Sequence, residues 1–198
     1  WQSRGRLHIQ HTLPAPWAHL SGENWFLASS TSDSDAEPTQ FIHQHRSQSD
    51  PIALAFRGYL SNPSLPHWAP SSSILEYWKD NLNSRRHNGV FSASIIDHNA
   101  KRLTLVSDAF GLAPFYYRRV ADTVLFSTSA RFLIMPDDRV DELGAGWLFA
   151  AGQLLDDRSL VRGIHRVPAG SALQFDEFGC GKRSWFSLDS LPQDPLPI

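Results

Sequence analysis

The histidines and the single cysteine are the side chains of this chain that are best suited to bind a metal or attack a substrate. His8 and His11, like His43 and His45, have the short spacings of metal ligands, but no cysteine or acidic cluster joins them. We therefore interpret both pairs as solvated surface residues. Cys180 stands between two glycines and is interpreted as an unreactive cysteine in a loop.

Acidic residues form a second group of side chains that could bind a ligand or take part in catalysis. The run consists of Asp137, Asp138, Asp141 and Glu142. Its simplest interpretation is a helix N-terminus, where the helix macrodipole favours negative charge. Asp156 and Asp157 are expected to cap a turn. The sequence contains no glycine-rich loop that would cradle a phosphate, so we do not expect this chain by itself to bind ATP.

The composition bounds the classes of protein to which the chain can belong. Its 198 residues, 41% of them hydrophobic, suffice for one domain with one core. The net charge of −2 comes from 18 basic and 20 acidic residues spread along the chain, which excludes nucleic acid and anionic membranes as expected partners. No run approaches the roughly 20 apolar residues of a membrane span. A single cysteine permits no internal disulfide and the N-terminal residues resemble no signal peptide, so we predict a cytoplasmic protein.

Strands are the commonest elements that the pattern predicts. Residues 51–60 form an apolar run typical of a buried strand, and Gly58 inside it indicates a close approach of two backbones. Four β-rich runs between residues 90 and 128 predict an antiparallel meander. Its middle turn contains Asp108 and Gly111, and Pro114 restricts the backbone that follows.

Two helices are expected as well. The serines at 71–73 offer an N-cap to apolar residues that recur at helical spacing over 74–82. A second helix should begin near Asp141 and end at Gly152. Trp147 lies at the centre of its apolar stripe, so we expect this side chain to be buried. The other members of the stripe are Leu143, Leu148 and Ala151.

Several segments of the sequence resemble, in order and spacing, the motifs of a known family. The segments "SDAFGLAPFYYRR", "VLFSTSARFLI" and "LVRGIHRVPAGSALQF", preceded by "HNGVFSASIIDHNAKRLTLVSD", resemble those of asparagine synthetase N-terminal domains. Those domains are class II glutamine amidotransferases of the Ntn hydrolase type. The resemblance covers about residues 56–186 and implies an α+β fold, a four-layer αββα sandwich of two antiparallel sheets flanked by helices.

The same resemblance implies that the glutaminase pocket is vestigial. The family uses an N-terminal cysteine as nucleophile, where this sequence has Trp1. Arg57 stands at the position of the oxyanion-hole asparagine, while the neighbouring Gly58 is kept. Ser71 replaces the aspartate that holds the substrate amino group, and "WFLASSTSD" offers no arginine for the substrate carboxylate. We therefore expect no catalytic residue among Arg57, Gly58 and Ser71.

These comparisons lead to one main functional hypothesis. Residues 1–188 are interpreted as a degenerate glutamine amidotransferase-like domain, and the Pro-rich residues 189–198 as a linker toward an ATP-dependent synthetase domain. As in β-lactam synthetases and lasso-peptide cyclases, the domain would serve as a scaffold or docking domain of an amide-forming ligase. ATP and Mg²⁺ would bind to the synthetase domain, on this chain or on a partner chain, and the substrate would be a peptide or a small-molecule carboxylate.

Two alternatives remain open at this stage. The domain is an active glutaminase if a cysteine precedes the sequence and becomes the mature N-terminus. It is a peptide- or partner-binding module if Arg57 and the aromatic surface hold an acidic ligand without any ligase domain.

Overall fold

The structure, a computed structural model, describes residues 17–21, 26–30, 40–47, 50–61 and 88–190. This part of the chain contains eleven β-strands, the α-helix α2 (Glu142–Ala151) and two short 3₁₀ helices, η1 (Ala130–Leu133) and η2 (Leu188–Ser190). None of the helices in these ranges is long and apolar enough to cross a membrane.

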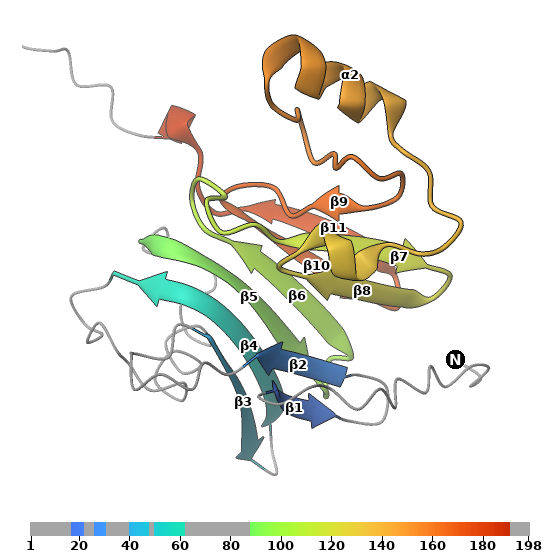
Figure 1. The fold of residues 1–198 in the computed structure, drawn as a ribbon. Helices are drawn as coiled ribbons and strands as arrows, with labels where there is room; N and C mark the ends of the chain where they lie inside the picture. The colour runs from blue at the N-terminus through green and yellow to red at the C-terminus, as the bar shows by residue number, and fades with distance from the viewer. Residues whose placement is uncertain (1–16, 22–25, 31–39, 48–49, 62–87, 191–198) are drawn as a thin grey trace, which may run out of the picture.

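Six antiparallel strands form the larger sheet (Figure 1). In spatial order they are β11 (Gly179–Ser184), β10 (Ser171–Asp176), β6 (Arg102–Ser107), β5 (Gly89–Asp97), β4 (Asp50–Leu60) and β3 (Gln40–Ser47). Successive side chains of a strand point to opposite faces, so the apolar strands supply residues to both faces. One face, called here the outer face, includes Leu54, Phe56, Phe91, Val106 and Ala172, which are all buried.

The opposite face, called here the inner face, carries Ala53, Ile96, Leu105, Leu173 and Phe175. A smaller sheet of β8 (Thr123–Ser127), β7 (Tyr116–Val120) and β9 (His165–Arg166) stacks on it. Phe126 of β8 and Tyr117 of β7 pack against the inner-face cluster. The expected sandwich of two antiparallel sheets is therefore confirmed.

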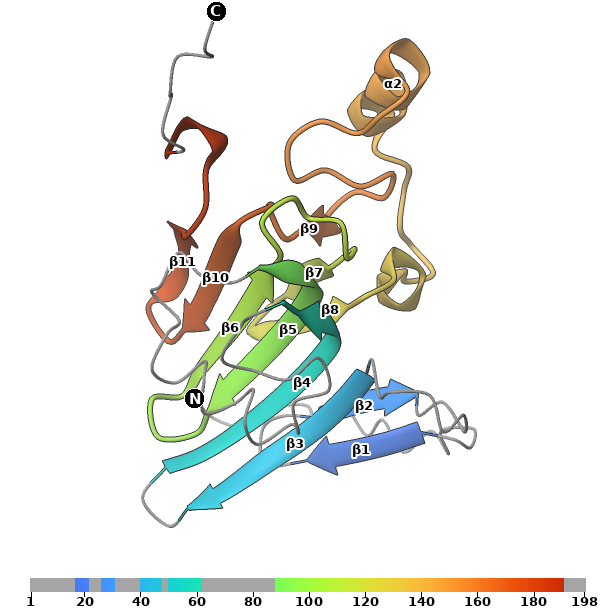
Figure 2. The same ribbon diagram turned by 90° about the vertical axis from the view of Figure 1, so that its left-hand side faces the viewer.

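A hairpin of β1 (Trp17–Ser21) and β2 (Phe26–Ser30) covers another part of the inner face. Leu27 of this hairpin is buried against Ala53 and Ile96. Figures 1 and 2 both place the hairpin beside β3 and β4, on the side of the larger sheet that also carries β7 and β8. Two separate β units thus cover different parts of the inner face.

The predicted four-stranded meander is wrong in one respect. β5 pairs with β6 and β7 pairs with β8, as expected, but β6 and β7 belong to different sheets. Residues 108–115 carry the chain from the larger sheet to the smaller one. A β-rich run shows the same alternation whether its next neighbour pairs edge to edge or stacks face to face, so the pattern could not distinguish the two arrangements.

Asp108 organises this crossing. Its carboxylate is fully buried and accepts backbone N–H bonds from Phe110 (3.0 Å), Leu112 (2.9 Å) and Ala113 (2.8 Å). Its own carbonyl accepts a bond from the Gly170 N–H at 2.8 Å, which ties the crossing to the start of β10. The turn predicted at Asp108 and Gly111 is confirmed, and Gly111 adopts a φ of +63°.

Helix α2 begins and ends where the sequence predicts. Asp141 is its N-cap, and Gly152 terminates it in the left-handed conformation with a φ of +70°. The expectation that Trp147 is buried is wrong, because 38% of its surface remains exposed. Figures 1 and 2 show α2 standing beyond β9 and away from both sheets. The other expected helix, at 74–82, lies outside the described residues.

We predict that Asp108→Ala destabilises the protein by about 3 kcal/mol or more, because three backbone N–H groups of the crossing lose a charged acceptor. Urea unfolding followed by tryptophan fluorescence measures the change. Asp122→Ala is the control, since Asp122 is exposed in the turn between β7 and β8 and its loss should cost less than about 0.5 kcal/mol. Equal effects of the two substitutions would contradict this role of Asp108.

A second prediction compares two phenylalanines of opposite exposure. Phe115 is 4% exposed and lies between the sheets, so Phe115→Ala should lower the free energy of unfolding by about 3–5 kcal/mol. Phe149 on α2 is 89% exposed, so Phe149→Ala should change the unfolding free energy of this domain by less than about 0.5 kcal/mol. A large loss for Phe149→Ala in the isolated domain would mean that α2 belongs to its core.

Candidate functional site

Gly58, one of the residues expected to form the vestigial pocket, lies near the end of β4. Gly58 has a φ of +113°, and a Cβ atom added to it would lie 2.0 Å from the carbonyl oxygen of Val90. No other residue fits this position without displacing the backbone of β5. The close approach predicted from the sequence is therefore confirmed.

Arg57 lies next to this glycine, and its surroundings are polar. The pairing of β4 with β5 sets Arg57 opposite Ser92, on the inner-face side of the larger sheet. Arg57 is exposed, and no ion pair joins it to an acidic side chain within the described ranges.

Two buried hydroxyl groups lie beside Arg57 on the same face. Ser92 and Ser94 are 2% and 1% exposed, and neither Oγ atom has a hydrogen-bond partner in the described part of the structure. The next hydroxyl in this row, on Ser107, is used structurally and donates to the carbonyl of Pro168. This end of the inner face therefore combines an exposed guanidinium with buried hydroxyls, a set that offers hydrogen-bond donors to an anion.

The other residues singled out in the sequence are not brought to Arg57 by any described contact. Trp1, Ser71, His8 and His11 lie outside the described residues. His43 and His45 occur on β3, where they pair in register with Leu54 and Ile52. No group of three or more potential metal ligands occurs in the described ranges.

Cys180 is found in the edge strand β11 and not in a loop, so that part of the interpretation is wrong. It is exposed, and partial burial of its sulfur raises the pKa of the thiol. A raised pKa keeps the group protonated at neutral pH, and the thiolate is the reactive form. The described structure therefore gives no activating environment to this thiol.

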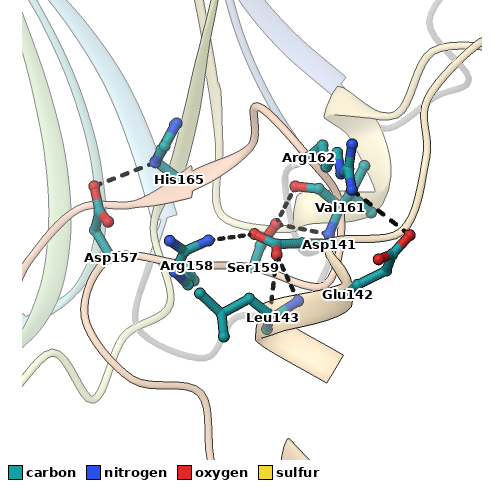
Figure 3. A network of polar contacts seen from close by, with 10 residues as sticks. Asp141, Glu142, Leu143, Asp157, Arg158, Ser159, Val161, Arg162 and His165 are labelled. Atoms are coloured by element: carbon teal, nitrogen blue, oxygen red, sulfur yellow. Dashed lines mark hydrogen bonds and ion pairs between the residues drawn. The ribbon is translucent and has the colours of Figure 1, made fainter. Parts of the chain in front are cut away.

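The acidic run has two structural roles. Asp141 caps α2 by accepting the N–H bonds of Leu143 and Gly144, each at 3.1 Å. Its other carboxylate oxygen accepts a bond from Arg158 Nη1 at 2.9 Å (Figure 3). The Gly144 N–H bond, followed by the bond from Arg158, holds the pKa of Asp141 below its usual range. The predicted helix N-terminus is confirmed for Asp141 and for Glu142 in the first turn.

Asp138 does something different from what the sequence predicts. It does not join the helix N-terminus, because it pairs with Arg118 of β7 through bonds of 2.6 and 3.0 Å. Arg118 is only 9% exposed and also donates to the carbonyl of Leu133. The bond from Arg118, aided by the Met135 N–H, lowers the pKa of Asp138. The feature of the sequence that could have indicated this ion pair is Arg118 itself, because it lies in the middle of β7 at a buried position.

A network of polar contacts ties together the two segments that flank α2 (Figure 3). The Asp141 N–H donates to the carbonyl of Leu160, and the Arg162 N–H donates to the carbonyl of Arg139. Side chains add the ion pair between Glu142 and Arg162 at 3.6 Å and a contact of 3.2 Å between Asp157 Oδ2 and His165 Nδ1. These contacts join residues 138–141 to residues 157–162, and the two joined segments, called here the stem, support α2.

Comparison with known proteins identifies the family. Residues 74–186 match the family described as the glutamine amidotransferase domain, and this chain belongs to that family. Over 122 residues it is 24% identical to an enzyme of Bacillus subtilis (strain 168) named "Asparagine synthetase [glutamine-hydrolyzing] 3". The match covers 60% of this chain but only 20% of that relative. Arg57, Gly58 and Ser71 precede the residues matched to the family.

Two solved structures resemble the fold more distantly. One is glutamine phosphoribosylpyrophosphate amidotransferase of B. subtilis, with 13% sequence identity and a TM-score of 0.45 over 75% of this chain. The other is described as the allosteric regulatory enzyme of purine biosynthesis, with 16% identity and a TM-score of 0.46 over 74% of this chain. The chain corresponds to 31% of the length of each of these proteins.

The lowered pKa of Asp141 predicts a pH dependence of stability. A group whose pKa is depressed by folding stabilises the protein above its unfolded value of about 3.9, and this contribution is lost as the pH falls through the folded value. Asp141→Asn keeps a capping side chain but removes the charge. The stability difference between parent and variant should thus be largest near neutral pH and shrink as the pH falls below about 4.

Urea unfolding of the parent, the Asp141→Asn variant and an Asp137→Asn control at several pH values tests this prediction. Asp137 is exposed four residues before the cap, so its substitution should leave the curve unchanged. A gap between parent and Asp141→Asn that stays constant with pH would show that the charge of Asp141 does not contribute.

Proposed function

We propose that this domain is a catalytically inactive, glutaminase-like N-terminal domain of a cytoplasmic ATP-dependent ligase that forms amide bonds. The observation that carries the proposal is Arg57 beside Gly58. Gly58 keeps a backbone conformation that only glycine fits, while the neighbouring position holds an arginine where the resemblance expects the asparagine of an oxyanion hole. The strand geometry is retained, but the neutral amide donor is not.

The chemistry of the substitution supports inactivity. An oxyanion hole works when its donors are already positioned around the oxygen that becomes negative. An arginine carries its N–H groups further from the backbone than an asparagine, on a longer and more flexible side chain. The guanidinium of the exposed Arg57 is better suited to a carboxylate than to a single oxygen held next to the Gly58 backbone.

The similarity to an asparagine synthetase supports the second half of the proposal. Because that relative is about five times as long as the matched region, the proposal assigns ATP and Mg²⁺ binding to a synthetase domain beyond this one. There, ATP would activate the carboxylate of a peptide or small molecule, and an amine of the substrate would replace ammonia. The present domain would then support folding and docking rather than supply ammonia.

The test uses the full-length protein. We expect no release of glutamate from glutamine above the uncatalysed background, and no asparagine from aspartate, ATP and glutamine. Arg57→Asn should leave both readings unchanged, since one restored donor does not rebuild the other missing groups. Glutamate release by the parent that is lost on alkylation of an N-terminal cysteine would overturn the proposal in favour of an active glutaminase.

A further inference from the structure

We propose that the apolar surface of α2 is the docking surface for the carboxyl-terminal ATP-using domain of the same polypeptide. This inference rests on the proposed function, because it names the part of the ligase that the domain contacts. It assigns a task to a helix that contributes almost nothing to the core described above.

The first reason for this proposal is that the side chains of α2 are mostly apolar and exposed. Among its ten residues Glu142 alone is charged, and its large side chains are apolar. All of them are exposed in this structure: Leu143 by 54%, Trp147 by 38%, Leu148 by 36% and Phe149 by 89%. A helix that is apolar on every side is normally buried. In the assembled protein, these side chains therefore require a cover.

The apolar surface continues from the helix onto its stem. Val140 and Leu160 are 61% and 40% exposed, and Asp141, next to Val140, bonds to the carbonyl of Leu160. Val140 also forms a β-bridge with Val161. Scattered apolar residues are common on protein surfaces, but a contiguous group of this kind marks an interaction site.

The stem presents this surface in a fixed orientation. A helix of ten residues is only marginally stable by itself in water. Here Asp141 and Gly152 cap its ends, and Arg158 and Arg162 tie its first turn to the returning chain (Figure 3). A preorganised surface loses less conformational entropy on docking than a mobile one.

Two observations favour a domain that follows in the same chain. The matched region makes up only 20% of the curated relative, so most of that protein lies outside the part matched here. In Figures 1 and 2, η2, the last described element, lies at the end of the molecule from which α2 projects. The two elements lie on opposite sides of that end, so a domain that continues from η2 reaches α2 by extending across it.

A second copy of this chain fits the surface less well. A stable interface buries about 1,200–2,000 Å² in total. Two helices that are each about 15 Å long cannot by themselves bury that area against each other. A larger neighbouring domain can cover α2 and its stem together.

Photo-crosslinking in the full-length protein tests the proposal. The crosslinking residue p-benzoylphenylalanine replaces Phe149 in one variant and Phe178 in a matched control. Phe178 is 91% exposed in the turn between β10 and β11, so the two positions differ in location and hardly in exposure. We expect the crosslinker at 149 to form an intramolecular bond to residues beyond 198, mapped by mass spectrometry, and the crosslinker at 178 to form none.

An additional substitution checks that the apolar face causes the contact. In the variant carrying the crosslinker at 149, Trp147→Asp should abolish the cross-link, whereas Phe178→Asp should preserve it. Cross-links from position 149 to a second copy, equal cross-links from both positions, or none from position 149 would each overturn the proposal. The readout needs neither ATP nor glutamine, so an active glutaminase would overturn the proposed function while leaving this contact testable.

Discussion

The buried carboxylate of Asp108 is the interaction on which the two-sheet arrangement depends. It lies where the chain leaves β6 for β7, and its hydrogen bonds fold residues 110–113 into a tight crossing. An uncompensated carboxylate is costly inside a protein, so its three N–H partners have to stay in place. Because the Asp108 carbonyl also receives the Gly170 N–H, the same residue sets the start of β10 relative to the crossing.

The smaller sheet in turn determines where α2 stands. The chain leaves this sheet after β8, passes through η1 and α2, and returns as β9 beside β7. Hydrogen bonds anchor both ends of this excursion: Arg118 of β7 binds Asp138 before the helix, and the Arg166 N–H of β9 donates to the carbonyl of Asp157 after it. These contacts hold the segments on either side of α2, although the large apolar side chains of the helix are exposed in this domain.

The contacts around Gly58 and Arg57 show which of these two positions the fold constrains. The conformation of Gly58 is enforced by the backbone of β5, so it persists as long as β4 and β5 pair. The neighbouring Arg57 is under no such packing constraint, because it is exposed. A substitution at position 57 can therefore change the chemistry of this site without disturbing the pairing of β4 with β5, as the proposed function requires.

The sequence by itself determined the local features. Asp141 and Gly152 bounded α2, Gly58 required a close approach, and the ordered motifs identified the family, since capping, positive φ and motif spacing are properties of short segments. The tertiary structure decided the rest. It assigned β6 and β7 to different sheets, paired Asp138 with Arg118, and left Trp147 exposed. Each of these depends on contacts between residues far apart in the chain, and alternation or helical periodicity records which face is apolar but not what covers it.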